Sequence, residues 1–426
     1  MRVALVNPNL YLEPPVIPLA VEYLAHYLDR EGHEVKVIDL SFASEPGEAL
    51  ARELESFDPQ VAGFTLRNVD TSLYHDNVFL LDGAKELISV CRRHSDARVV
   101  IGGSALLAGP REVADFLGCD HAVYGPGERA LPALLRYLEK GVSPPRLCDG
   151  WEHSFDRGEV PARGVWVDYA PYLEKRGVAG FATQTGCRGT CSFCLEAGLP
   201  WRSRKPEAVV EELESLHAEG CEELHLCDCE FNQDLDTQKE LLRQMARADL
   251  GISWSLYMKP LPHDSNLFGL LAVGGAGSLT LSVDSESLTR GAYSFEDLRS
   301  FLAQARKHGI GVAVDLLVGF PGEDREGLRY TFDFFRDARP DTVGVNAWIR
   351  IFKYTGLGVG MRAGSPAAGS IEGDDPDYIR PVYYSWLSVD DCRELIEDDP
   401  LFRIEGLERR SNYERLHDRP AEDADR

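Results

Sequence analysis

The sequence predicts a two-domain α/β protein in which a doubly wound parallel sheet precedes a second, barrel-like series of β/α units. The chain has 426 residues, of which 44% are hydrophobic and 27% charged, a composition typical of a folded globular protein with room for two cores. Short β-branched runs alternate with helical patterns along two long stretches of chain. A segment with little periodicity, 141–179, separates the stretches and is predicted to be a linker.

The first domain, 1–140, carries the pattern of a doubly wound sheet. Its apolar runs lie at 2–8, 34–40, 61–67, 98–104 and 121–127, and the first helix is expected at Leu19–Arg30. Such sheets bind ligands at the carboxyl ends of their strands. The loops at 7–9, 66–70, 102–104 and 124–128 are therefore candidate binding loops, although tight turns after buried strands also require glycine.

The second domain, 180–355, repeats the pattern with six strand units. The runs lie at 180–187, 222–229, 253–258, 278–284, 311–320 and 341–352, and a helical segment follows each of the first five. Units of this kind close into a barrel or a partial (β/α)6 barrel with its active site at the carboxyl-terminal face. Residues 356–426 are predicted to form a C-terminal extension.

The composition and charge of the chain disfavour a membrane protein and a nucleic-acid-binding protein. No run approaches the roughly 20 apolar residues of a membrane span, and the first residues lack a signal-peptide pattern, so a cytoplasmic protein is expected without membrane contact. The net charge of -25 disfavours a nucleic-acid-binding protein, because phosphates are bound by clustered Lys and Arg. The expected substrate is a small molecule or a peptide.

Three cysteines after the first strand of the second domain carry the main chemical signal. Cys187, Cys191 and Cys194 have Cys-x3-Cys-x2-Cys spacing, and three thiolates leave one iron of a 4Fe-4S cluster open to an outside ligand. The competing interpretation is a structural zinc site, which would need a fourth ligand from a distant part of the chain. The non-enzyme alternative is therefore an iron-sulfur or zinc-binding interaction protein. The motif resembles the radical S-adenosylmethionine (SAM) superfamily, which implies that SAM chelates the open iron and is cleaved to a 5'-deoxyadenosyl radical.

The resemblance extends to segments that bind SAM in that superfamily. Residues 227–232 stand in place of a Gly-Gly-Glu-like turn but depart from it, and 282–285 and 318–323 resemble later polar turns. The implied SAM-binding residues are Phe193, Asp228, Cys229, Glu230, Ser282, Asp284, Ser285 and Gly319. The additional cysteines, Cys221, Cys227 and Cys229, are interpreted as apolar packing rather than a second cluster, with a catalytic thiol at Cys229 left open.

A doubly wound domain ahead of such a barrel resembles the radical SAM class whose Rossmann-like first domain binds cobalamin. The implied cobalamin-binding residues are Asn7, Pro8, Arg67, Gly102, Gly103, Tyr124, Gly125, Gly127 and Glu128. The Asp-x-His-x-x-Gly motif that supplies a histidine to cobalt is missing. We hypothesise that the permanently protonated Arg67 neighbours cobalt instead, the alternative being an ion pair with Asp70 or another nearby carboxylate.

The resemblance implies a cobalamin-dependent methyltransferase that acts on an unactivated carbon of a small metabolite or peptide. An external electron donor such as flavodoxin or ferredoxin is expected to reduce the cluster. The candidate substrate contacts are Trp348, Arg350 and Tyr354. The alternative is a radical cyclisation, rearrangement or oxidation without methyl transfer. A methylthiotransferase is disfavoured because neither an amino-terminal cysteine trio nor a basic carboxyl-terminal module is present.

Overall fold

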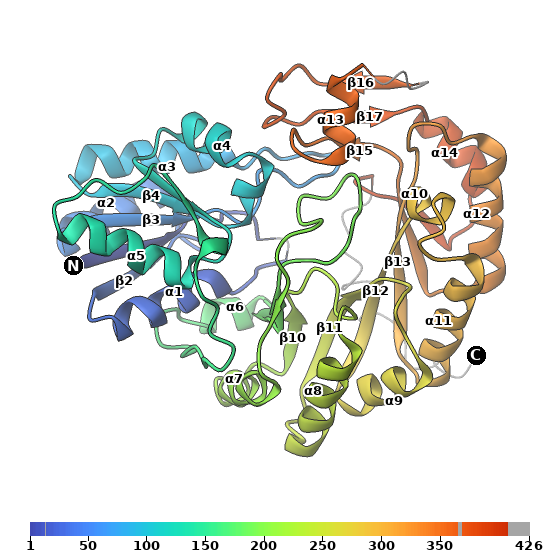
Figure 1. Ribbon diagram of the computed structural model, residues 1–426, viewed down its shortest axis with the longest axis horizontal. Coiled ribbons are helices and arrows are strands. Elements are labelled where there is room, and N and C mark those ends of the chain that lie inside the picture. The colour runs from blue at the N-terminus through green and yellow to red at the C-terminus, as the bar shows by residue number, and fades with distance from the viewer. Residues whose placement is uncertain (13, 365–368, 408–426) are drawn as a thin grey trace.

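The computed structural model describes residues 1–12, 14–364 and 369–407, which form two lobes (Figure 1). The amino-terminal lobe contains a parallel sheet with strand order β2-β1-β3-β4-β5-β6. Its strands are β1 (Arg2–Asn7), β2 (Glu34–Asp39), β3 (Val61–Thr65), β4 (Arg98–Gly102), β5 (His121–Tyr124) and β6 (Leu147–Asp149). The connecting helices are α1 (Leu19–Arg30), α2 (Pro46–Phe57), α3 (Leu81–His94), α4 (Pro110–Leu117) and α5 (Gly127–Glu139).

Strand order in this sheet places a ligand crevice at its carboxyl edge. Strands β1 and β3 are neighbours, and the chain runs from β1 to β2 on one side and from β3 to β4 on the other, so the loops that follow β1 and β3 diverge. The predicted doubly wound fold is confirmed. Strand β6 comes from the segment that the sequence assigns to the linker, and it extends the sheet by pairing Leu147 with Ala122.

The second lobe is an arc of seven parallel strands in the order β18-β14-β13-β12-β11-β10-β7. These are β7 (Ala179–Phe181), β10 (Glu223–Leu226), β11 (Ser253–Met258), β12 (Ala276–Asp284), β13 (Gly311–Leu317), β14 (Thr342–Asn346) and β18 (Phe402–Ile404). The helices around the arc are α7 (Pro206–Ala218), α8 (Leu235–Ala248), α9 (Ser265–Val273), α10 (Ser285–Thr289), α11 (Phe295–Lys307) and α12 (Arg325–Ala338). The predicted partial barrel is confirmed. Its edge strand β18 comes from the predicted C-terminal extension.

Smaller elements complete the active-site face. The antiparallel sheet of β15 (Ile349–Arg350), β17 (Tyr383–Ser385) and β16 (Ser370–Glu372) lies with α13 (Gly356–Arg362) at the top of Figure 1. Between β8 (Gln184–Thr185) and β9 (Arg202–Ser203) runs the cysteine loop, green in Figure 1, which lies between the lobes. The remaining helices are α6 (Ala170–Glu174), α14 (Val389–Ile396) and the short 3-10 turns η1 (Ser104–Ala108) and η2 (Gly150–Glu152).

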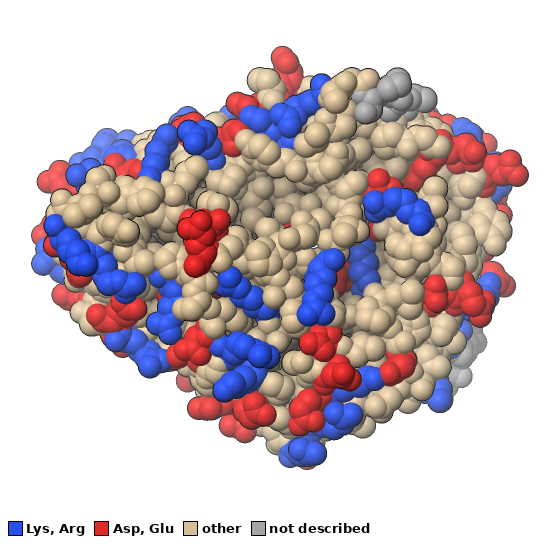
Figure 2. Space-filling view, in the orientation of Figure 1, with Lys and Arg blue, Asp and Glu red and all other residues tan. Residues whose placement is uncertain are grey.

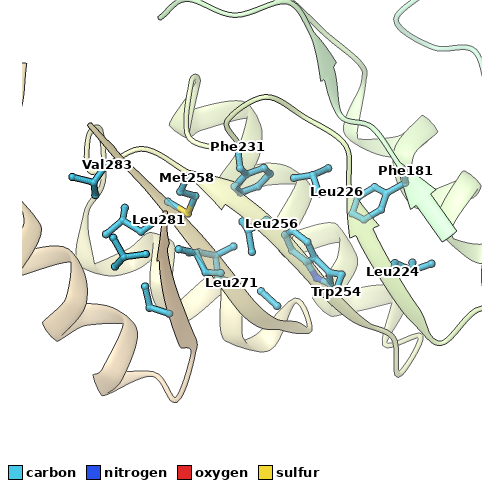
Figure 3. Close-up of a cluster of buried hydrophobic side chains, with 14 of the residues drawn as sticks. Phe181, Leu224, Leu226, Phe231, Trp254, Leu256, Met258, Leu271, Leu281 and Val283 are labelled. Carbon is cyan, nitrogen blue, oxygen red and sulfur yellow. The ribbon is translucent and has the colours of Figure 1, made fainter. Parts of the chain in front are cut away.

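One hydrophobic core extends across both lobes. Between the barrel strands and their outer helices, Phe181, Trp254 and Met258 pack with the other side chains drawn in Figure 3. The same cluster includes Val21 and Leu28 of α1, so the amino-terminal lobe is packed onto the barrel through apolar contacts. Among the described helices, none is both long and apolar enough to cross a membrane.

Candidate active site

Cys187, Cys191 and Cys194 line one cavity at the carboxyl ends of the barrel strands, called here the cysteine cavity. Their loop is held by backbone hydrogen bonds, including one from Cys187 N–H to the Leu199 carbonyl at 3.2 Å. Within the described chain, no three His, Cys, Asp or Glu side chains are arranged to hold a single metal ion. Three thiols around one open cavity fit a site-differentiated 4Fe-4S cluster.

Carboxylates and one lysine line the rest of the cysteine cavity. Five of the predicted SAM-binding residues line it: Phe193, Cys229, Glu230, Ser282 and Asp284. Burial raises the pKa of Glu230 to about 8, and within the described structure its buried Oε2 has no hydrogen-bond partner. A buried oxygen of this kind requires a donor from water or from a ligand. The ammonium group of SAM fits this requirement.

Lys259 is a cavity residue that the sequence analysis missed. Its Nζ lies 3.2 Å from Asp284 Oδ2, and Asp284 in turn caps α10 through Ser287 N–H at 2.7 Å. Burial lowers the pKa of Lys259, but the charges of Glu230 and Asp284 outweigh it and raise the pKa overall. Lys259 could have been predicted from the sequence, because it directly follows a predicted strand and must therefore lie at the same edge of the barrel as the other loops.

The remaining predicted SAM-binding residues lie behind the cavity wall. The buried Asp228 carboxylate accepts hydrogen bonds from the backbone N–H groups of Thr183 at 2.8 Å and Gln184 at 3.2 Å, which tie β10 to β7. Burial raises the pKa of Asp228 to about 7. Ser285 Oγ and Gly319 N–H both donate to the Glu323 carboxylate. These groups fix the turns that carry the lining residues.

A second cavity, called here the glycine cavity, opens at the carboxyl edge of the amino-terminal sheet. Five predicted cobalamin-binding residues line it: Gly102, Gly103, Gly125, Gly127 and Glu128. The Trp151 indole also lines it, and its buried Nε1 has no partner among the described residues. Only glycine fits at 125, because a Cβ there would lie 2.5 Å from that nitrogen.

The glycine cavity therefore fits cobalamin, whose amide and phosphate oxygens can accept the Trp151 N–H. Four of the nine predicted contacts do not line it: Asn7, Pro8, Tyr124 and Arg67, of which Arg67 is described below. Asn7 Nδ2 donates to Asp39 at 2.9 Å and to Ser41 at 3.0 Å, and the Tyr124 hydroxyl donates to Asp149 at 2.7 Å. Pro8 is not among the residues that line the described cavities.

A third cavity, called here the arginine cavity, lies between the loops after β3 and β4 and the barrel. Its lining includes Arg67, Ser104, Phe193, Leu317, Arg350 and Phe352. Arg350 Nε binds Asp70 Oδ2 at 2.9 Å, so the alternative pairing of Arg67 with Asp70 does not occur. Among the described residues Arg67 forms no ion pair. Burial, aided by the Arg67 charge, lowers the pKa of His225 on β10 to about 4.

Of the three candidate substrate contacts, only Arg350 lines the arginine cavity. Trp348 is buried and stacks on Tyr74 with ring centroids 5.2 Å apart. Tyr354 is exposed, and its hydroxyl donates to Glu112. Figure 2 shows that charged side chains spread around the rim of this face, whereas the hollow between the lobes is mostly uncharged.

Comparison with known proteins identifies the family. A model of the B12 binding domain matches residues 10–135, and a model of the Radical SAM superfamily matches residues 181–335. The chain is a cobalamin-dependent radical SAM enzyme. This radical SAM enzyme is 27% identical to the tryptophan 2-C-methyltransferase of Streptomyces laurentii over 442 aligned residues, which cover 83% of the chain and 73% of the relative. It is also 30% identical to the ribosomal protein uS12 methylthiotransferase RimO of Pelobacter propionicus, over 67% of each chain.

Solved structures agree with this assignment. The radical SAM methyltransferase TsrM from Kitasatospora setae, with cobalamin and a 4Fe-4S cluster bound, superposes with a TM-score of 0.84 at 27% identity, covering 96% of this chain and 93% of that one. A second TsrM structure, with tryptophan substrate and a SAM analogue bound, gives a TM-score of 0.86 at 26% identity. The predicted cofactors, cluster, SAM and cobalamin, are confirmed, as is the C-methyltransferase class.

Replacing Gly103 with alanine is expected to weaken cobalamin binding at least tenfold. Gly103 has φ +100°, which side-chain-bearing residues rarely adopt, and an added Cβ would lie 2.2 Å from the Leu66 carbonyl oxygen. Cobalamin retained after gel filtration, measured by its absorbance, checks this. Gly83→Ala is the control, since a Cβ at Gly83 meets nothing within 4 Å. Equal retention by both variants would contradict the expectation.

Proposed function

We propose that this enzyme transfers a methyl group to a carbon atom of a small aromatic amino acid, such as tryptophan, held in the arginine cavity. The observation that carries the proposal is that the arginine cavity adjoins both others. It shares Ser104 and Leu107 with the glycine cavity, and Phe193 and Leu317 with the cysteine cavity. A substrate there lies beside both cofactors. The similarity to tryptophan 2-C-methyltransferase supports an aromatic amino acid.

We propose that the cysteine cavity binds the cluster and SAM together. Cys187, Cys191 and Cys194 are the cluster ligands, which with SAM supply redox chemistry when bound. The orphaned Glu230 oxygen accepts the SAM ammonium group, and Lys259 neutralises the SAM carboxylate. Ser282 and Asp284 offer acceptors to the ribose hydroxyls. Cys191 and Cys194 are half-buried, so an external donor such as flavodoxin or ferredoxin can approach the cluster.

We propose that the glycine cavity holds cobalamin, which when bound supplies a carrier for the methyl group. The bare backbone at Gly102, Gly103 and Gly125 lets the large ligand approach the sheet edge, and the Trp151 N–H donates to it. Arg67 lines the adjoining arginine cavity and forms no ion pair with any described residue. Because a guanidinium stays protonated and is not a metal ligand, Arg67 can neighbour cobalt without coordinating it.

The test is methyl transfer from SAM carrying a deuterated methyl group to L-tryptophan by the reconstituted holoenzyme. The expected product, identified by mass spectrometry, carries the labelled methyl group on a carbon atom. Altered tryptophan without the label would favour the alternative of radical cyclisation or oxidation. Unchanged tryptophan, with the label passed to another acceptor, would overturn the substrate class but not methyl transfer.

A further inference from the structure

The Trp151 indole presents an unused hydrogen-bond donor at the wall of the glycine cavity. Its buried Nε1 has no partner among the described residues. The ring lies against the backbone of Gly125, where an added Cβ would come within 2.5 Å of Nε1 and 2.7 Å of Cδ1. The Asp149 carboxylate fixes the start of the turn by accepting the Trp151 backbone N–H at 2.8 Å. Both contacts come from the amino-terminal lobe.

Arg202, on strand β9 of the second lobe, holds the same turn. Its Nη2 donates to the Trp151 carbonyl at 2.6 Å, and its Nη1 donates to the His153 carbonyl at 3.0 Å. The guanidinium carbon lies 5.7 Å from the centre of the Trp151 ring, within the range of a cation–π contact. The half-buried Arg202 lines none of the three cavities, so it can affect their contents only through other residues.

The position of Arg202 is set by the cysteine loop. Arg202 directly follows this loop and pairs with Thr185 of β8, where the loop begins. Thr185 and Leu199, near the two ends of the loop, line the glycine cavity themselves. The hairpin that carries the cysteine trio therefore also carries the residue that holds Trp151.

We propose that Arg202 is a positioning residue for cobalamin, which holds Trp151 so that the indole N–H donates to an oxygen of the cofactor. This inference rests on the proposed function of the glycine cavity. The planar guanidinium carries its donors in a fixed arrangement, so two hydrogen bonds to neighbouring carbonyls orient the whole turn. A donor that is fixed before the ligand arrives loses less conformational entropy on binding than one that must first be ordered.

Replacing Arg202 with methionine is expected to weaken cobalamin binding about tenfold, the scale of losing one well-placed hydrogen bond. The dissociation constant is measured by equilibrium dialysis of cobalamin against the full-length, cluster-reconstituted protein. Arg202→Lys is expected to recover only part of the affinity, because one ammonium group cannot reproduce the planar fork or the stacking of a guanidinium. Iron content and melting temperature verify that each variant is folded and keeps its cluster.

Arg157→Met is the matched control. Arg157 also ties the segment 141–179 to β9, since its Nε donates to the Ser203 carbonyl at 2.8 Å and its Nη2 donates to Ser203 Oγ at 2.9 Å. It lines none of the three cavities. The control is expected to change the dissociation constant by less than about twofold. Equal weakening by Arg157→Met and Arg202→Met would overturn the inference, because any tie between the segment and β9 would then serve.

A double-mutant cycle with Trp151→Phe tests whether Arg202 acts through the indole. Phenylalanine removes the N–H donor but keeps an aromatic ring, and this variant is expected to bind cobalamin about tenfold more weakly. In the Trp151→Phe protein, Arg202→Met is expected to add no more than about twofold, whereas independent effects would multiply to about a hundredfold. Multiplication of the two losses would assign Arg202 a merely structural role and overturn the inference.

Failure of this inference is distinguishable from failure of the proposed function. If the wild type keeps its cluster but binds no cobalamin, the proposed function of the glycine cavity fails and the inference fails with it. If the wild type and Arg202→Met bind cobalamin equally, only the inference is overturned. Should Arg202→Met lose its cluster or fail to fold, the same cycle is measured with Arg202→Lys, for which full affinity would count against the inference.

Discussion

Replacing Cys191 with alanine is expected to remove the cluster and lower the rate of methyl transfer by about 10³-fold or more, the scale of losing an essential catalytic group. Two remaining thiolates cannot hold a four-iron cluster with one open iron. Cobalamin is expected to stay bound, because Cys191 lines the cysteine cavity and not the glycine cavity. Iron and sulfide content, the cobalamin spectrum and labelled product measure the three effects.

Cys221→Ala is the matched control for this variant. Cys221 is also buried and belongs to the barrel core, but it lines none of the three cavities. The control is expected to keep four irons per chain and wild-type methyl transfer. A full cluster in Cys191→Ala, or its loss in Cys221→Ala, would show that the cysteine trio is not the ligand set.

Replacing Arg163 with methionine is expected to destabilise the protein by about 3–5 kcal/mol, the range for breaking a buried ion pair. Arg163 joins the lobes: its Nε binds Glu22 of α1 at 2.8 Å, and its Nη1 binds Glu212 of α7 at 2.6 Å. All three side chains have 0% exposure. The substitution leaves the Glu22 carboxylate buried without its cation, while Arg204 still pairs with Glu212.

The melting temperature of the holoenzyme measures this effect, and cobalamin retention is expected to fall with it because the glycine cavity is bounded by both lobes. Arg299→Met is the control. Arg299 pairs with Asp337 at 2.7 Å, but the two side chains are 49% and 68% exposed. Removing such a surface pair costs at most about 1 kcal/mol. Equal shifts in the two variants would show that the buried network does not hold the lobes together.

Features encoded over short distances in the chain were predictable. The helix expected at Leu19–Arg30 has those bounds, because its apolar residues recur at helical spacing. The cysteine spacing indicated one ligand set, and its three members line one cavity. The glycine-containing loops after β4 and β5 line the glycine cavity because parallel strands end at one edge of a sheet.

Features that depend on contacts between distant segments were not predictable. Trp151 lies in the predicted linker, and its place in the glycine cavity depends on packing against Gly125. Strand β18 is short and joins the barrel only through its pairing with β14. The polar residues Asn7, Tyr124 and Asp228 are at strand ends as expected, but each turns toward a hydrogen-bonding partner behind the ligand space.

The sequence by itself determined the two β/α domains, the candidate cluster ligands and the sheet edges at which the cavities open, because periodicity and spacing are properties of neighbouring residues. Tertiary structure alone decided which side chains meet. The pairing of Arg350 with Asp70 leaves Arg67 free of that carboxylate, and docking of the lobes brings the three cavities together at Glu196. Those contacts join residues far apart in the chain, and their geometry follows from how the lobes pack.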